Sequence, residues 1–211
     1  MFNYARHHQY HHHYHNHDDD NDALLSITGD YSILDRKSDE NGVAEAASSI
    51  NENVGFMAYN VLAGGFLTDK YIDAPVPYDN PSLMSSLTQR KESRGRHDFD
   101  GWGRTLYRYR SDPAKESIKY YREIAKDNKM SLLELSLRWT RERSLVTTSL
   151  LGISNMKQFD EDMSFYQKDA LSDDVMWQID RIHMRHRNPI FSSTRVGRDW
   201  NGEGEIGEVI P

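Results

Sequence analysis

Two apolar runs constrain the fold of this chain more than any other feature of its sequence. They cover residues 54–65, VGFMAYNVLAGG, and residues 144–155, SLVTTSLLGISN. Each run ends in small residues, and the capping box formed by Ser131 and Glu134 predicts a helix between them. Apolar strands that alternate with helices are typical of a parallel sheet whose site lies at the carboxyl ends of its strands. The sequence therefore predicts an α/β fold, the last part of a (β/α)8 barrel, which is the half that usually binds an anionic group.

Chain length limits how much of such a barrel can be present. The chain has 211 residues, whereas a complete (β/α)8 barrel usually needs about 250 and rarely has fewer than about 200. Long stretches of the sequence lack the barrel pattern. We therefore expect a partial (β/α)8 TIM barrel with fewer than eight strands.

Composition excludes several classes of protein. The formal net charge of −7 argues against a nucleic-acid partner, which favours a basic surface. There is no cysteine, which excludes disulfides and thiolate chemistry. No apolar run approaches the roughly 20 residues of a membrane span, and the amino-terminus lacks the apolar core of a secretory signal. We expect a cytoplasmic protein with no membrane span and no nucleic-acid partner.

The sequence divides into three parts. Residues 1–22 are rich in His and Asp and cannot bury a core, so we predict a disordered head. Clustered imidazoles and carboxylates can capture metal ions, but the spacing resembles no closed zinc site, and a solvated tail is the favoured interpretation. Residues 23–187 are predicted to form the folded unit, and the Gly- and charge-rich residues 188–211 a carboxyl-terminal tail.

Within the folded unit, periodicity and helix caps predict alternating strands and helices. The predicted strands cover residues 24–27, 54–62 and 145–151. The predicted helices cover residues 41–49, a stretch opened by Pro113, a stretch capped by Ser131, residues 155–166 and a stretch capped by Ser172. Their predicted inward residues are Val43, Ala46, Ala47, Ile50, Ile118, Tyr121, Ala125, Leu132, Leu135, Trp139, Val175, Ile179 and Ile182.

A long irregular segment, residues 63–112, separates the second strand from the helix opened by Pro113. A loop of this length is either functional or disordered. The basic and aromatic residues between Arg104 and Arg110 could bind RNA. However, the chain is acidic, and a helical turn with one aromatic face explains the same spacing.

Residues 152–155 lie where a predicted strand ends and a helix begins. Free N–H groups and a partial positive charge at such a helix start attract phosphate, and small residues let it approach. Ser154 adds a hydroxyl and Lys157 a positive charge. Ser and Asn also cap many helices for stability alone, and that alternative stays open. Tyr59, at the end of its strand, could stack on a planar ring or simply pack in the core.

Four segments, in order, resemble the aldo-keto reductases. Residues 31–36 (YSILDR) and 57–71 (MAYNVLAGGFLTDKY) resemble the sixth and seventh strand regions of that family. Residues 136–139 (SLRW) resemble its Ala-Leu-Arg-Trp helix, and 152–162 (GISNMKQFDED) its Gly-x-Ser-x-x-x-Gln-Leu-x-Glu-Asn cofactor segment. The similarity runs from about residue 26 to about residue 171. Within the family, the sequence most resembles the branch that includes potassium-channel β subunits and related bacterial reductases.

The resemblance implies an NADPH site. Tyr59 would stack on the nicotinamide. The residues implied along or near the pyrophosphate are Asn60, Leu62, Gly64 and Lys70. The residues implied around the 2′-phosphate and the adenosine are Gly152, Ser154, Lys157, Gln158, Glu161 and Asp162.

The chain departs from the family pattern at several of these positions. Asn60 and Val61 replace Ser-Pro, Asp69 replaces the Gly before Lys70, and Asp162 replaces Asn. Thr28 and Gly29 stand where the family usually has Gln-Asn. The expectation for this chain is therefore weak NADPH binding or none.

The family's catalytic Asp, Tyr, Lys and His lie on its second to fourth strands, and nothing before Leu24 could supply those strands. The resemblance thus implies an oxidoreductase fragment with strands six to eight, their helices and the tail, and with no catalytic residue. In the family the reaction is NADPH-dependent reduction of aldehydes and ketones, small-molecule carbonyl substrates; this chain alone is expected to be inactive. Two alternatives stay open: a non-catalytic module that senses nicotinamide cofactor, and an inactive truncated gene product.

Overall fold

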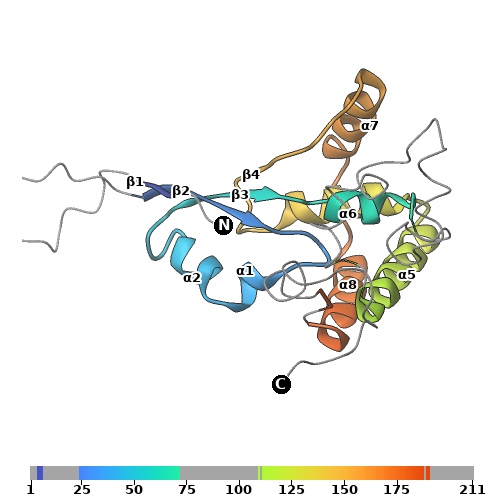
Figure 1. The fold of residues 1–211 in the computed structure, drawn as a ribbon, viewed down its shortest axis with the longest axis horizontal. Helices are drawn as coiled ribbons and strands as arrows, with labels where there is room; N and C mark the ends of the chain where they lie inside the picture. The colour runs from blue at the N-terminus through green and yellow to red at the C-terminus, as the bar shows by residue number, and fades with distance from the viewer. Residues whose placement is uncertain (1–3, 7–23, 72–108, 110, 188, 191–211) are drawn as a thin grey trace, which may run out of the picture.

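The computed structural model describes residues 4–6, 24–71, 109, 111–187 and 189–190 (Figure 1). They contain a sheet with the strand order β1-β2-β3-β4. The strands are β1 (Tyr4–Arg6), β2 (Leu24–Asp30), β3 (Gly55–Tyr59) and β4 (Thr148–Ser149). β2, β3 and β4 run parallel, and β1 pairs antiparallel with β2. The α/β class is thereby confirmed, whereas the partial barrel stays a prediction.

Strand register brings the ends of the three parallel strands to one edge. Asp30 of β2 pairs with Tyr59 of β3, and Ala58 of β3 pairs with Ser149 of β4. The Leu150 N–H donates to the Ala58 carbonyl at 2.8 Å, so pairing continues just beyond β4. The chain segments that follow β3 and β4 therefore start at the same edge of the sheet, where a parallel sheet presents its site.

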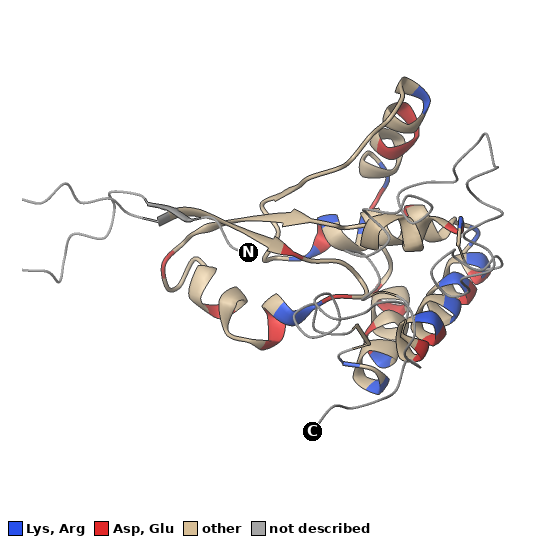
Figure 2. Ribbon diagram, viewed as in Figure 1, with Lys and Arg blue, Asp and Glu red and all other residues tan. Residues whose placement is uncertain are grey.

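Helices surround the strands. They are α1 (Lys37–Glu40), α2 (Val43–Ala47), the 3-10 helix η1 (Ala63–Thr68), α5 (Asp112–Asp127), α6 (Leu132–Glu142), α7 (Met156–Tyr166) and α8 (Asp173–Arg185). In Figure 1, α1, α2, α5 and α8 lie on one side of the strands and α7 rises on the other. Charges of both signs line α5 (Figure 2). Among the described residues, no helix has both the length and the apolarity to cross a membrane.

Four side-chain caps start the longer helices where the sequence predicts them. The hydroxyls of Ser111, Ser131 and Ser172 and the side-chain oxygen of Asn155 each accept a hydrogen bond from a backbone N–H three residues on. Such a cap satisfies an N–H group that the helix itself leaves unpaired, and it typically contributes about 1 kcal/mol. The predicted starts of these helices are confirmed to within one or two residues.

The core gathers around Trp139 of α6, which is fully buried. Tyr31 stacks on it, with ring centroids 5.5 Å apart and planes at 20°, and Phe56 of β3 meets Tyr31 edge-on at 5.7 Å. The hydroxyl of Tyr121 on α5 donates to the Ile33 carbonyl at 3.2 Å. Burial raises the pKa of Tyr121 to about 12, so its hydroxyl stays a neutral donor. Ile50 and Ala46 are exposed and were predicted wrongly, and Val43 and Ile182 are half-buried; the other predicted inward residues lie in the core.

Three predictions about elements are corrected. The helix expected over residues 41–49 is the shorter α2, and Ile50 is 92% exposed because the backbone turns extended at Ser48. The strand expected over 145–151 is reduced to β4. In the capping box, Ser131 caps as predicted, but Glu134 turns to Arg138 and Lys168 instead of returning to the cap.

Some predictions fall wholly or partly outside the described residues. Tyr4–Arg6 forms β1, although the sequence places it in the disordered head; the rest of residues 1–22 is not described. The tail beyond Ile190 and the suggested RNA-binding stretch, apart from Tyr109, are not described either.

Candidate functional site

The segment that follows β3 begins with Tyr59 and Asn60. Tyr59 is half-buried, and its carbonyl accepts a hydrogen bond from the Tyr31 N–H at 3.1 Å. Asn60 adopts a left-handed backbone conformation (φ 55°), which Asn tolerates better than most residues. Its amide donates to Asp30 at 3.3 Å, and the Tyr109 hydroxyl donates to the same carboxylate at 3.1 Å. Asp30 thus ties the ends of β2 and β3 together.

The backbone then winds through a tight turn into η1. Gly64 and Gly65 have φ angles of 66° and 104°, values that favour glycine. A Cβ at Gly65 would lie 3.4 Å from the Tyr71 ring, an ordinary contact distance, so the backbone conformation is what favours glycine here. The Leu62 carbonyl accepts from the Gly65 N–H at 2.8 Å. The turn therefore presents a defined backbone at the end of β3.

Asp69 closes η1 and precedes the exposed Lys70. Its φ of 64° is the left-handed conformation that suits the Gly of the family pattern. Arg122 of α5 lies with Nε 3.1 Å from Asp69 Oδ1. The two groups form an ion pair, but the Arg122 Nε–H is not aligned for a hydrogen bond to the carboxylate. The carboxylate thus anchors the turn that carries Lys70 to α5.

The second segment joins β4 to α7, and its proposed phosphate donors are exposed. Gly152, Ser154 and Lys157 all face solvent. Asn155 caps α7 by accepting from the Gln158 N–H at 3.0 Å. The Gln158 side chain turns back and accepts from the Ser154 N–H at 3.0 Å. One backbone donor at this helix start is therefore already engaged within the chain.

Asp162, on α7, is the residue whose pKa responds to a charge from the segment after β3. It is the only buried residue along α7, every residue of which is described. Burial, followed by the negative charge of the exposed Glu161, raises the pKa of Asp162, and the positive charge of Lys70 acts in the opposite direction. Lys70, from the segment after β3, therefore lies within electrostatic reach of α7.

The sequence reasoning missed two contributors to this site. Asp30 stands at the end of β2, a position that could have marked it, because strand ends carry sites in parallel sheets. Nothing in the sequence marked Arg122 as a site residue, since it is one of many charged residues on α5. No group of three or more His, Cys, Asp or Glu residues suited to a metal occurs in the described part of the chain.

Comparison with known proteins decides the family. The model of the aldo/keto reductase family matches residues 7–183. The chain belongs to the aldo/keto reductase family. The match begins inside the His-rich head, so the expectation that the similarity starts near residue 26 is too narrow.

Curated relatives support the same family. The chain is 28% identical over 170 residues to an aldo-keto reductase of Babesia bovis, covering 80% of this chain and 54% of that protein. It is 26% identical over 167 residues to Protein tas of Escherichia coli K12, covering 79% and 42%. It is 26% identical over 151 residues to L-glyceraldehyde 3-phosphate reductase of Escherichia coli O157:H7, covering 72% and 39%. The chain spans about half of the curated relatives it matches, or less.

Proposed function

We propose that this chain forms the phosphate- and adenosine-binding part of an NADPH site in an aldo-keto reductase-type oxidoreductase. One observation carries the proposal. The parallel register opens the segments after β3 and β4 at one edge of the sheet, and Lys70 of the first lies within electrostatic reach of Asp162 in the second. A dinucleotide that carries a pyrophosphate and a separate 2′-phosphate is the kind of ligand that spans two such segments.

The residues after β3 suit the nicotinamide and pyrophosphate. Tyr59, half-buried at the strand end, would offer its ring to the nicotinamide. The backbone turn at Asn60, Leu62 and Gly64 lets a pyrophosphate approach closely, because Gly64 has no side chain. Lys70 is exposed and supplies positive charge.

The residues after β4 suit the 2′-phosphate and the adenosine. Gly152 leaves room for the phosphate, Ser154 offers a hydroxyl donor, and Lys157 adds a positive charge at the positive end of the α7 dipole. Gln158, Glu161 and Asp162 would face the adenosine. Asp162 in place of Asn adds a carboxylate here, and Gln158 already holds the Ser154 N–H. Both features predict weak binding.

When bound, NADPH supplies the hydride that reduces an aldehyde or a ketone. We propose that residues 24–187 position this cofactor and contribute no general acid to the reaction. Because general acid catalysis contributes roughly 100- to 10,000-fold, the purified chain should show no measurable carbonyl reduction. Robust aldehyde turnover would contradict this assignment. Cofactor binding without turnover would also be the behaviour of a cofactor-sensing module.

Titration of the purified chain with NADPH and NADH tests the site. Only NADPH carries the 2′-phosphate, so the double variant Ser154→Ala/Lys157→Ala should weaken NADPH more than NADH. Lys126→Ala, which removes an exposed charge from α5, is the matched control and should leave both dissociation constants unchanged. Equal losses for the two cofactors in the double variant would remove the 2′-phosphate assignment.

A further inference from the structure

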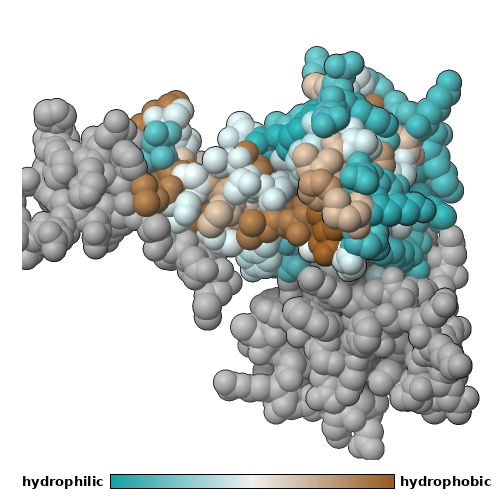
Figure 3. Space-filling view, turned by 90° about the horizontal axis from the view of Figure 1, so that it is seen from above, coloured by the Kyte–Doolittle hydropathy of each residue, from teal (hydrophilic) through white to brown (hydrophobic). Residues whose placement is uncertain are grey.

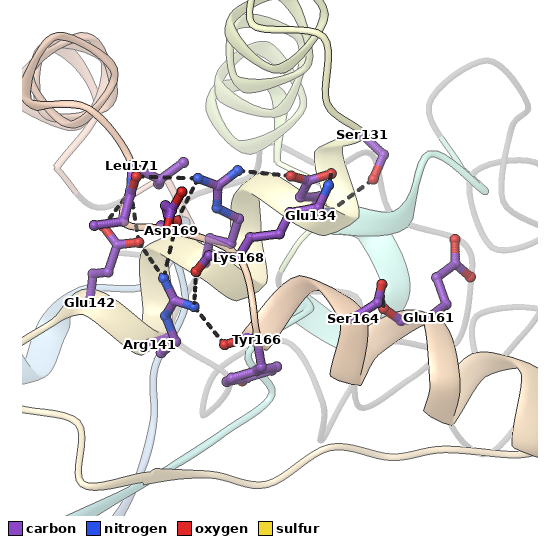
Figure 4. Close-up of polar contacts among 12 residues, drawn as sticks. Ser131, Glu134, Arg141, Glu142, Glu161, Ser164, Tyr166, Lys168, Asp169 and Leu171 are labelled. Carbon is purple, nitrogen blue, oxygen red and sulfur yellow. Dashed lines mark hydrogen bonds and ion pairs between the residues drawn. The ribbon is translucent and has the colours of Figure 1, made fainter.

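Arg141 of α6 holds the end of α7 (Figure 4). Its Nη1 donates to the carbonyls of Tyr166 at 2.6 Å and Lys168 at 2.8 Å. Tyr166 is the last residue of α7, so the guanidinium lies at the carboxyl-terminal end of that helix. The partial negative charge of a helix end stabilises a cation there.

Arg138, one turn earlier on the same face of α6, extends this contact along the connection between α7 and α8. Its Nη2 donates to the Asp169 carbonyl at 2.8 Å. The Glu142 carboxylate accepts from the Leu171 N–H at 2.9 and 3.0 Å. Side chains of one helix thus satisfy the backbone of a turn whose own side chains are mostly exposed.

Carboxylates keep the two guanidinium groups aimed at the turn. Glu134 bridges Arg138 Nη1 and Lys168 Nζ, each at 2.8 Å, and Glu142 accepts from Arg141 Nη2 at 3.0 Å. The side chains of Glu134 and Arg138 are only 7% and 11% exposed. Solvent therefore screens the pair of Glu134 and Arg138 far less than it screens surface ion pairs. We call Arg138 and Arg141 the arginine clamp.

Little else fixes the amino-terminal half of α7. None of residues 156–161 is buried, and Met156 and Phe159 are exposed; Asp162, in the carboxyl-terminal half, is the only buried residue of α7. Figure 1 shows α7 rising away from the other helices. The clamped end and the proposed phosphate-binding end are thus opposite ends of one helix.

We propose that Arg141, supported by Arg138, is a positioning residue for the cofactor. This inference rests on the proposed NADPH function. α7 has 11 residues, and at about 1.5 Å rise per residue a tilt of about 10° at the clamped end displaces its first turn by roughly 3 Å. A misplacement of about 1 Å already impairs a positioned site. The clamp therefore sets where Ser154 and Lys157 stand relative to β3.

The test compares Arg141→Gln and Arg141→Lys with a matched control. Arg185→Gln removes another arginine, which forms an exposed ion pair with Glu116 on α5. Hydrogen exchange of the α7 amides is measured without cofactor, and dissociation constants are measured for NADPH and NADH. For Arg141→Gln, we expect α7 amides to exchange at least about tenfold faster while α5 amides are unchanged. NADPH affinity should fall at least about fivefold and NADH affinity less than about twofold.

Arg141→Lys keeps the charge but lacks the planar fork, so its effects should be intermediate, and it serves if the Gln variant does not fold. Arg185→Gln should change neither readout. Unchanged α7 exchange, or an equal rise in α5, would overturn the clamp. Faster α7 exchange with unchanged NADPH affinity would overturn its positioning role. If the wild-type chain binds no NADPH, the proposed function is wrong, and hydrogen exchange alone then decides whether the clamp orients α7.

Discussion

The guanidinium carbon of Arg36 lies 4.5 Å from the centre of the Trp139 ring, inside the core. Arg36 is 4% exposed, and its Nη1 lies 2.6 Å from Asp180 Oδ1 on α8. Arg36 ends the YSILDR segment and Trp139 ends the SLRW segment. Two of the four segments that resemble the family therefore meet in the core. Their contact joins the segment after β2 to α6 and α8, so Arg36 and Trp139 stabilise the fold.

Arg36→Met should destabilise the chain by about 2–3 kcal/mol, because it removes a nearly buried ion pair and a cation–π contact. The partly exposed Asp180 can hydrate, which keeps the loss at the lower end for such pairs. Urea unfolding measures the free energy. Arg185→Met, which removes an arginine from an exposed ion pair, should change it by no more than about 0.5 kcal/mol. Equal losses in the two variants would contradict the structural role of Arg36.

His183 predicts a loss of stability in mild acid. Burial, followed by the charge of Arg36, lowers the pKa of His183 below its ordinary 6.5, although Glu40 lies 2.8 Å away and Asp180 is nearby; both favour the protonated form. The unfolded chain therefore binds more protons than the folded chain just below about pH 6.5. The free energy of unfolding should fall as the pH drops from about 7 through this region toward the folded pKa.

Unfolding in urea at several pH values between about 7.5 and 5 measures this effect. His183→Gln removes the titrating group, so its stability should decline less over the same range. Identical pH slopes for the wild type and the variant would rule out His183 as the source.

Asp69 gives a prediction about backbone conformation. Asp69→Gly removes the strain of a left-handed conformation, which should stabilise the folded chain by up to about 1–2 kcal/mol. It also removes a partly exposed ion pair with Arg122, which should cost about 0–1 kcal/mol. Asp69→Ala loses the pair and keeps the strain. We expect the free energy of unfolding to rank Gly at or above Asp, with Ala lowest by about 1 kcal/mol. An Ala variant as stable as the Gly variant would show that the turn relaxes.

The sequence predicts the parts of this molecule that depend on neighbouring residues. Ser131, Asn155 and Ser172 start helices because each bonds to an N–H three residues on, a contact written within a few positions. The prediction that Ile50 faces the core was wrong, because helical periodicity assumes an unbroken helix, whereas the backbone becomes extended at Ser48. The edge where β3 and β4 end was predictable from the alternation of apolar strands and helices, which indicates parallel strands whose carboxyl ends share one edge of a sheet.

Contacts between distant charges could not be predicted. Arg36 and Asp180 are 144 positions apart, and Asp69 meets Arg122 across the segment that separates β3 from α5. The chain has many charged residues of each sign, and sequence alone does not say which of them meet. The sequence pointed to one residue of the arginine clamp, because Arg138 lies in a segment that resembles the family. The backbone partners of the clamp could not be predicted, because they depend on how α7 and α8 pack on α6.

The exposed apolar residues of α7 lead to a prediction about association. Met156, Phe159 and Met163 lie at helical spacing and are 68%, 41% and 38% exposed. Figure 3, which looks onto the side from which α7 rises, shows an apolar strip open on that face, and Leu150 and Ile153 are also exposed. Contiguous exposed apolar surface favours association. We therefore expect the purified chain to form oligomers or aggregates at micromolar concentration and to lack the cooperative thermal transition of a monodisperse monomer.

Light scattering after size-exclusion chromatography measures this association. The triple variant Met156→Gln/Phe159→Gln/Met163→Gln replaces the exposed apolar stripe of α7 with polar side chains and buries no polar group. It should therefore raise the monomer fraction. Trp177→Gln on α8 removes an aromatic residue that is more exposed than Phe159 but lies outside the stripe, and it should have a smaller effect. If the wild-type chain runs as a monodisperse monomer, or if Trp177→Gln raises the monomer fraction as much as the triple variant does, the α7 stripe is not the surface that drives association.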